Sequence, residues 1–311
     1  MLTKRLLPLT GLLSLFALIA GSIQSRAAED HPGCVWEVAG KANTVYLAGS
    51  MHLLTEKDYP LPQPYDDAYK KSEKIWFEAP PDKINDPAIA LQVMQMAMYT
   101  EPGQSLKTEL SPETYQALVK GLQGHQLFAL MPDVDKIRPG FLAIMLGQLE
   151  LMEMGARPDL GLDMHLYQRA VADRKETGGL ETWDFQMKLL NQFNKEENDK
   201  MVRYTLDNLG KTKEFFEKLV ERWKKGDAEG VAAAMNEGLE DFPELAEVLL
   251  IDRNRSWIEK IEPMLSEEDK DVMVVVGTGH LVGKDSVIEL LEKKGYTVRQ
   301  LRIAAEPVPA Q

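Results

Sequence analysis

Two histidines at opposite ends of the chain follow apolar segments in nearly the same way. Residues 44–48 lead into Gly49-Ser50-Met51-His52, and residues 272–276 lead into Gly277-Thr278-Gly279-His280. Glycine allows a sharp turn after a strand, and ligands bind at the carboxyl ends of strands in α/β sheets. If the two strands are neighbours, both imidazoles face one crevice. A lone histidine is more often a structural residue, but the repeated context favours a shared site.

Two imidazoles suit a borderline metal such as zinc, manganese or cobalt, which needs one or more carboxylates to complete its ligands. Glu78 is the first candidate because it follows the short apolar segment 75–77. Glu181, in Gly178-Gly179-Leu180-Glu181, is the second. Either glutamate could instead be a helix cap or a surface carboxylate. A metal-activated water with one glutamate as general base would make the site a hydrolase.

The elements that must position these residues are strands near both ends of the chain. Segments 35–38 and 44–48 flank Gly40-Lys41-Ala42-Asn43 and predict a hairpin. Segment 75–77 and the continuous apolar run 272–276 predict buried strands, and 297–303 predicts a last strand. Apolar residues at spacings of three and four predict helices over 139–154, 160–173, 212–225 and 243–265, with further helices starting at Ser111-Pro112 and spanning 285–294.

These patterns predict an α/β fold with a central β-sheet and a large helical insertion at about 86–265. Within the insertion, Ile89, Leu91, Val93, Met94, Met96 and Met98 leave almost no polar face on one helix. A helix that is apolar all round is usually buried, and this is the expectation here. The functional alternative is a methionine-lined wall that adapts to peptide or lipid-like ligands.

The N-terminus has the pattern of a secretory signal peptide. Lys4 and Arg5 precede an uncharged stretch over 6–20, and the small-residue site Ser25-Arg26-Ala27 follows. Removal of residues 1–27 would leave one domain over 28–311, periplasmic or secreted and without a membrane span. The alternative is an uncleaved anchor, although the apolar stretch is short for one. A net charge of −13 argues against nucleic acid as a partner, and the single cysteine excludes an internal disulfide.

Several motifs, in order, resemble those of the TraB/GumN family, which includes the Tiki proteases and the pheromone-shutdown proteins. They read YLAGSMHLL, PLP, WFEAP, GLET, DRNRSWIEKI and VVVGTGHLVGKDSVIELLEKKGYTV, and the resemblance covers roughly residues 36–301. It implies a metal-dependent hydrolase, with peptidase activity in some members, and a fold similar to that of erythromycin-esterase and ChaN-like proteins.

The resemblance also implies roles for individual residues. His52, His280 and Glu78 match the two motif histidines and the motif glutamate. Asp163 matches a position that often holds an acid near the cleft, and Arg253-Asn254 match an Arg-Asn pair. An arginine can clamp a carboxylate or a developing oxyanion. The structural alternative for this arginine is a salt bridge to Asp252 or Glu259.

The remaining histidines are not expected to serve the site. His165 follows Asp163 by two residues, and such positions point to different faces of a helix. His125 and His31 are assigned no role.

The sequence thus predicts an exported hydrolase that uses a divalent transition metal on peptide or other small substrates. The alternatives are a non-catalytic metal, haem or small-ligand binding protein of the same fold, and a partner-binding scaffold that has lost its activity. An open coordination position beside a poised carboxylate would favour the enzyme.

Overall fold

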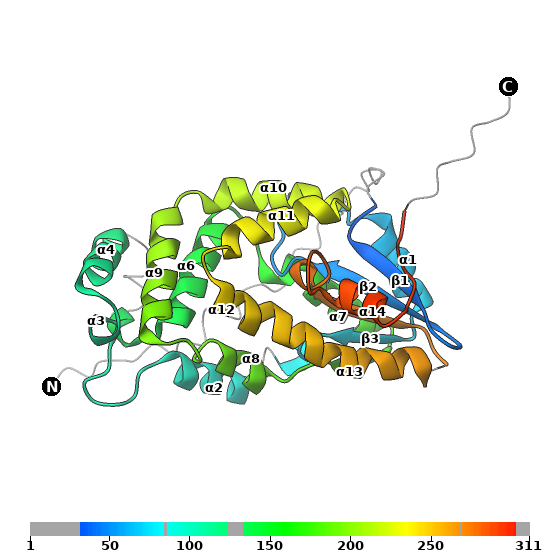
Figure 1. Ribbon diagram of the computed structural model, residues 1–311, viewed down its shortest axis with the longest axis horizontal. Helices are drawn as coiled ribbons and strands as arrows, with labels where there is room; N and C mark the ends of the chain where they lie inside the picture. The colour runs from blue at the N-terminus through cyan, green and yellow to red at the C-terminus, as the bar shows by residue number, and fades with distance from the viewer. Residues whose placement is uncertain (1–31, 84–85, 124–132, 268, 303–311) are drawn as a thin grey trace, which may run out of the picture.

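A six-stranded sheet lies at one end of the elongated molecule (Figure 1). The structure is a computed structural model, and it describes residues 32–83, 86–123, 133–267 and 269–302. The strand order is β4-β3-β5-β2-β1-β6. The strands are β1 (Val35–Ala39), β2 (Thr44–Ser50), β3 (Lys74–Phe77), β4 (Glu176–Gly179), β5 (Val272–Gly277) and β6 (Val298–Gln300). The α/β class expected from the sequence is confirmed.

Four consecutive strands of the sheet run parallel, and two antiparallel strands complete it on one side. β4, β3, β5 and β2 are parallel neighbours, whereas β1 pairs antiparallel with β2 and with β6. The predicted hairpin is therefore confirmed. So is the predicted adjacency of the strands before the two histidines, because Ser50 at the end of β2 pairs with Gly277 at the end of β5.

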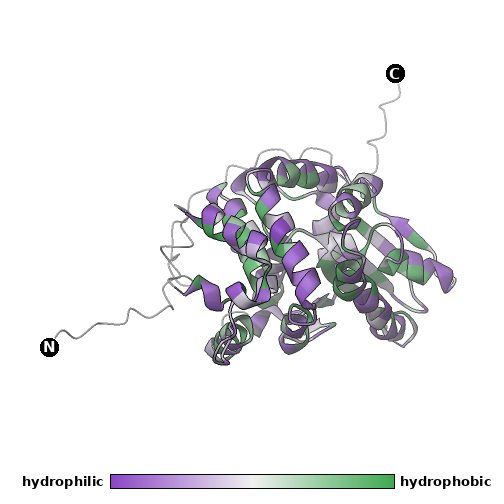
Figure 2. Ribbon diagram, turned by 60° about the vertical axis from the view of Figure 1, so that its left-hand side comes forward, coloured by the Kyte–Doolittle hydropathy of each residue, from purple (hydrophilic) through white to green (hydrophobic). Residues whose placement is uncertain are grey.

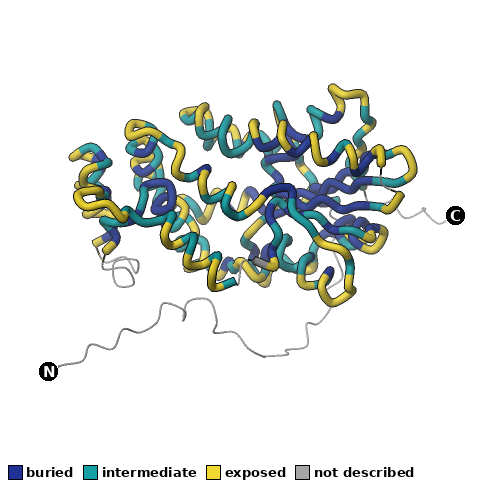
Figure 3. The backbone as a smooth tube through the Cα atoms, turned by 90° about the horizontal axis from the view of Figure 1, so that it is seen from below, coloured by how far each residue is buried: buried dark blue, intermediate teal, exposed yellow. Residues whose placement is uncertain are grey.

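Helices cover the sheet because its central strands are apolar on both faces. Nearly every residue of β2 and β5 is buried, as expected of parallel strands between helical layers (Figure 3). The helices that bury side chains in the same core are α1 (Gln63–Lys71), α7 (Leu162–Ala172), α10 (Thr212–Lys224), α11 (Ala228–Leu239), α13 (Asp252–Ser266) and α14 (Val287–Lys293).

The other end of the molecule is a helical lobe with its own apolar core (Figure 1). Its helices carry hydrophobic residues among hydrophilic ones (Figure 2) and bury leucines such as Leu118, Leu142 and Leu146. The lobe contains α2 (Pro87–Ala97), α3 (Leu106–Glu109), α4 (Pro112–Leu122), α6 (Pro139–Glu153), α8 (Trp183–Leu189), α9 (Lys195–Asn208) and α12 (Pro243–Ala246). Short helical turns are η2 (Glu56–Asp58), η3 (Pro81–Lys83), η4 (Val134–Lys136), η5 (Pro158–Leu160), η6 (Glu247–Ile251) and η7 (Thr278–His280).

The expected burial of the apolar helix α2 is wrong. No residue of Pro87–Ala97 is buried, and Leu91 and Met94 are 51% and 46% exposed. The helix reaches only the margin of the lobe, where Val93 and Met96 pack against the second core and Gln92 bonds Asp184 of α8. The sequence of α2 could not reveal its exposure, because an apolar helix is buried only where other elements of the fold cover it.

Three further features differ from the expected pattern. The expected helix 243–265 is interrupted by the π-helical turn η6, which leads into α13, with Arg253 as the second residue of that helix. Strand β4 lies inside the expected helical insertion and adds a fourth parallel strand beside β3. The expected last strand 297–303 is shorter, as β6, and residue 303 lies outside the described residues.

The expected signal peptide, residues 1–27, lies outside the described residues, as do His31 and His125. Within the part of the chain that the structure describes, no helix is long and apolar enough to cross a membrane.

Candidate functional site

The carboxyl ends of all four parallel strands carry a candidate residue. His52 follows β2, His280 follows β5, Glu78 follows β3 and Glu181 follows β4, each within a few residues of the strand's end. Because the four strands are consecutive neighbours in the sheet, the side chains lie along one edge.

Both imidazoles face the same oxygen of Glu78. The Nε2 atoms of His52 and His280 lie 3.9 Å and 3.8 Å from Glu78 Oε1. Gly277 leaves room for this meeting, since a Cβ there would lie 3.2 Å from Glu78 Oε1 and 3.4 Å from His52 Nε2. Its amide also donates to Glu78 Oε1 at 2.7 Å. The first glycine of the second Gly-x-x-His motif therefore matters for space as well as for the turn.

His52 is oriented by Asp163, the first-turn acid of α7. The Nδ1 atom of His52 lies 2.9 Å from Asp163 Oδ2, and the Ser50 hydroxyl donates to Asp163 Oδ1 at 2.8 Å. The Asp163 carboxylate raises the pKa of His52 to about 9. The His52 side chain is 60% exposed, so this side of the site is open to solvent.

His280 is held in a buried environment. Its Nδ1 lies 2.7 Å from Asn254 Oδ1, whose amide nitrogen donates to the Asp285 carbonyl. The ring packs against Trp257 with centroids 4.4 Å apart, and only 5% of the side chain is exposed. Burial lowers the pKa of His280 to about 3, so the ring is neutral.

These partners fix which nitrogen faces the site. A carboxylate only accepts hydrogen bonds, and the Asn254 amide already donates elsewhere. Nδ1 of each imidazole is therefore the donor, which leaves the lone pair of a neutral ring on Nε2, the nitrogen that lies nearer to Glu78. Metal-binding histidines use this arrangement, with the second ring nitrogen bonded to an outer acceptor.

Arg253 contacts three groups of the site: Glu78, His280 and Glu181. Its Nη2 donates to Glu78 Oε2 at 2.5 Å, and its Nη1 lies 3.1 Å from His280 Nε2. Nε and Nη2 also donate to the Glu181 carboxylate at 2.9–3.1 Å. The alternative prediction, a salt bridge from Arg253 to Asp252 or Glu259, is wrong, because Arg253 pairs with Glu78 and Glu181 instead. It is the neighbouring Arg255 that pairs with Asp252.

Glu181 is fully engaged in holding Arg253. Besides the arginine bonds, it accepts from Trp257 Nε1 at 2.8 Å and from Gln186 Nε2 at 3.2 Å, and its side chain is 2% exposed. A carboxylate with this many donors is poorly placed to take a proton from water. Glu181 therefore acts on the site through Arg253.

Glu78 is held in its charged form. Burial alone would raise its pKa, but His280, Arg253, His52 and the Gly277 amide together lower it to about 2. An ionised carboxylate with one oxygen facing two imidazoles has the chemistry of a metal ligand.

The donor set fits a divalent metal in type, since two imidazole lone pairs and one carboxylate oxygen converge beside Gly277. The spacing is wider than a bound metal would impose: ligand atoms 2.0–2.1 Å from a tetrahedral metal lie roughly 3.3 Å apart. In agreement, no group of three or more His, Cys, Asp or Glu among the described residues is arranged to hold a metal as it stands. A metal held by these three side chains would need them to move closer together.

The sequence did not single out three contributors. Ser50 supports Asp163, Trp257 packs on His280 and bonds Glu181, and Gln186 donates to both Glu78 and Glu181. A helical spacing of four from Arg253 to Trp257 was the available signal. Gln186 belongs to α8, and only the fold shows that this helix brings it to Glu78 and Glu181. His165 is packed on Tyr59 instead, as its position two residues after Asp163 predicted.

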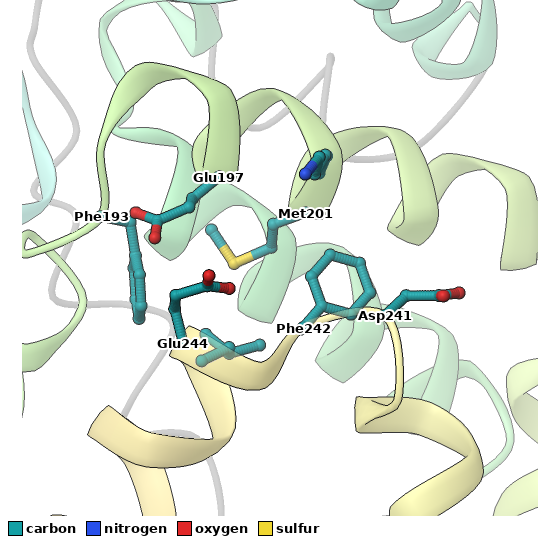
Figure 4. Close-up of a pocket in the computed structure, with 8 residues that line it drawn as sticks. Phe193, Glu197, Met201, Asp241, Phe242 and Glu244 are labelled. Carbon is teal, nitrogen blue, oxygen red and sulfur yellow. The ribbon is translucent and has the colours of Figure 1, made fainter.

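A separate pocket lies in the helical lobe, between the start of α9 and α12 (Figure 4). Its apolar lining residues include Phe193, Met201 and Phe242, and the acidic Glu197, Asp241 and Glu244 also line it. None of the candidate residues above lines it.

Comparison with known proteins identifies the chain's relatives. The "Metalloprotease TIKI1" of Danio rerio is 22% identical over 81% of this chain and 60% of the relative. The "Metalloprotease TIKI2" of Xenopus tropicalis is 22% identical over 88% of this chain and 60% of the relative. A "Metalloprotease TIKI homolog" of Nematostella vectensis is 24% identical over 56% and 42%. The chain thus spans 60% or less of the length of these three relatives.

No solved structure matches the chain. The family model described as the TraB/PrgY/gumN family matches residues 34–300, a range that holds both histidine motifs and all the other candidate residues. The chain therefore belongs to the TraB/PrgY/gumN family.

Proposed function

We propose that this protein is an exported metal-dependent hydrolase that cleaves peptide bonds, with His52, His280 and Glu78 as the metal ligands. The observation that carries the proposal is the convergence of the two imidazole Nε2 atoms on Glu78 Oε1. The names of the relatives, which are metalloproteases, support the same reaction class. A fold like that of erythromycin-esterase and ChaN-like proteins is part of the proposal.

The bound metal would supply a Lewis acid that activates water and polarises the scissile carbonyl. The chain's own residues would orient the metal ligands and stabilise the charge that develops on the substrate. Asp163 and Asn254 hold the two imidazoles in the tautomer that presents Nε2. Arg253 supplies positive charge beside the position where a carbonyl oxygen becomes negative. Water adds to the carbonyl carbon and the C–N bond breaks. One of the water's two protons goes to the leaving amine, and the other stays with the new carboxyl group until it is lost to solvent.

Of the two glutamates, Glu78 is the proposed ligand and Glu181 the positioning residue. Glu78 is ionised and faces both imidazoles, whereas Glu181 is occupied by Arg253, Trp257 and Gln186. The export of the protein is inferred from the pattern of residues 1–27, and a periplasmic or secreted location follows. N-terminal sequencing of the native protein tests this part.

The decisive experiment combines metal analysis with a turnover assay. Purified mature protein is analysed for bound metal and tested against a peptide library. His52→Ala and His280→Ala are expected to lose metal and cleavage together. His165→Ala is the matched control, because that ring packs on Tyr59 and not in the site, and it should retain both.

Glu78→Gln distinguishes a ligand from a base. A ligand role predicts that the variant loses metal, whereas a base role predicts that it keeps metal and loses only turnover. Full metal affinity in both histidine variants would disprove the proposal. Metal binding without cleavage of any peptide or ester by the wild type would instead identify a metal-binding protein of the same fold.

A further inference from the structure

The guanidinium of Arg253 occupies the donors that a metal would need. Nη1 lies 3.1 Å from His280 Nε2, so it uses the lone pair that would bind a metal. Nη2 donates to Glu78 Oε2 at 2.5 Å, which draws the carboxylate toward the arginine. Glu78 Oε1 meanwhile stays 3.8–3.9 Å from the two imidazole nitrogens. The arginine is a cation already seated at the site.

The opposite edge of the guanidinium is anchored away from the imidazoles. Nε donates to both oxygens of Glu181 at 3.0 Å and 3.1 Å, and the group lies over the Trp257 ring at 4.9 Å. Trp257 in turn donates to Glu181. These contacts hold Arg253 in the site through bonds that do not involve the imidazoles or Glu78. The arginine can therefore give up His280 and Glu78 and still keep a buried carboxylate partner.

A divalent metal and this guanidinium would repel each other at the site. Glu78 and Glu181 together carry two negative charges, and the arginine neutralises one of them. A divalent ion at the imidazoles would add two positive charges within a few ångströms of the guanidinium, in a poorly solvated place where charge repulsion is strong. It would also need the His280 lone pair now used by Nη1.

We infer that Arg253 is an internal competitor for the metal position: metal entry displaces its Nη atoms from His280 and Glu78, and Glu181 retains it. The inference rests on the proposed ligand set of His52, His280 and Glu78. Under this inference Arg253 sets the metal affinity, in addition to its proposed role of stabilising negative charge on a substrate. The inference also makes Glu181 the residue that draws the arginine away.

The test measures Co²⁺ affinity by calorimetry in the full mature protein. Arg253→Gln should bind Co²⁺ at least about tenfold more tightly, because a competing buried charge is gone. The matched control is Arg255→Gln, two residues on along α13, whose guanidinium pairs with the exposed Glu247 and Asp252. This variant removes the same charge outside the site and should leave the affinity unchanged. Unchanged or weaker binding by a folded Arg253→Gln would overturn the inference.

Loss of Arg253 leaves buried carboxylates unpaired and can unfold the chain, so thermal melting of each metal-free variant is measured and a second variant is used. Glu181→Gln keeps the arginine but removes the partner that draws it away. Arg253 then relies on Glu78, and Co²⁺ affinity should fall several-fold. The two variants thus move in opposite directions, whereas a purely structural role would weaken binding in both.

Unaltered affinity in Glu181→Gln would also overturn the inference. If the wild type and every variant bind no metal, the proposed function fails and the inference fails with it. If the wild type binds Co²⁺ and loses it in His52→Ala, while Arg253→Gln binds no more tightly, only the inference fails.

Discussion

Two histidines with similar sequence surroundings acquire opposite protonation properties from their neighbours. Asp163 stabilises the protonated form of His52, whereas burial against Trp257 keeps His280 neutral. In the metal-free protein we expect the His52 ring to titrate near pH 9 and the His280 ring to stay neutral down to about pH 3. Histidine NMR titration with assignment by single variants measures both, and Asp163→Asn should bring His52 back toward about 6.5.

The sign of the resulting pH dependence follows from the raised pKa. Because His52 titrates higher when folded than the roughly 6.5 of an unfolded chain, the pair with Asp163 stabilises fully below about pH 6.5. That contribution disappears as the pH rises through about 9. The contribution of this pair to the free energy of unfolding is small, because the exposed His52 side chain is screened by solvent.

Metal binding should follow the opposite trend, because a metal must displace the His52 proton. Apparent Co²⁺ affinity is expected to increase by about tenfold per pH unit while the ring remains protonated, and to level off near pH 9. Calorimetry across this range checks it. Affinity that does not vary with pH would show that His52 is not a ligand.

Gly277 offers a test of the space that the three ligands share. Its backbone angles, φ −50° and ψ 134°, suit alanine, so Gly277→Ala should fold. The added Cβ would lie 3.2–3.6 Å from Glu78, His52 and His280 atoms and should weaken metal binding by at least about tenfold.

The matched control is Gly147→Ala within α6, where an added Cβ meets nothing within 4 Å. It should keep metal affinity and stabilise the helix by about 0.5–1 kcal/mol. Metal titration and denaturant unfolding of both variants separate the site effect from a stability effect.

At the scale of elements, the adjacency of β2 and β5 was predictable because two similar strand-turn-histidine patterns favour a common edge. The π-helical turn before Arg253 was not, since an i→i+5 turn has no distinct pattern within the apolar run Val248–Ile251. Nor could the sequence choose Arg253's partners. Nearby acids such as Asp252 were plausible, but the fold brings in Glu78 and Glu181 from distant strands.

The exposed helix α2 gives a stability prediction. Leu91→Gln and Met94→Gln should each change the free energy of unfolding by no more than about 0.5 kcal/mol, because neither side chain is buried. Leu118→Ala in α4, in the core of the helical lobe, should cost about 2–5 kcal/mol. Urea unfolding of the three variants checks the contrast, and a large loss at Leu91 would restore the original expectation of a buried helix.

For the whole molecule, the site depends on contacts between segments that are far apart in the chain. β2 comes from the first part of the described chain and β5 from the last, and β1 lies between β2 and β6. The helical lobe is placed between these strands in sequence and sends α8, with Gln186, back to the site. Metal binding to residues from both ends should therefore stabilise the sheet as a unit.

The single cysteine can report on that unit without any mutation. Cys34 is fully buried beside β1, its carbonyl accepts from the Gly49 amide of β2, and burial, reinforced by Asp227, raises its thiol pKa to about 12. A thiol reagent should therefore modify it only when the sheet opens. Adding Co²⁺ at about 100 times its dissociation constant should slow modification about 100-fold if the metal binds only the folded form. In His52→Ala the protection should vanish while the rate without metal stays similar. Rapid modification of the native protein would mean that β1 opens independently of the sheet, and protection that persists in His52→Ala would place the bound metal elsewhere.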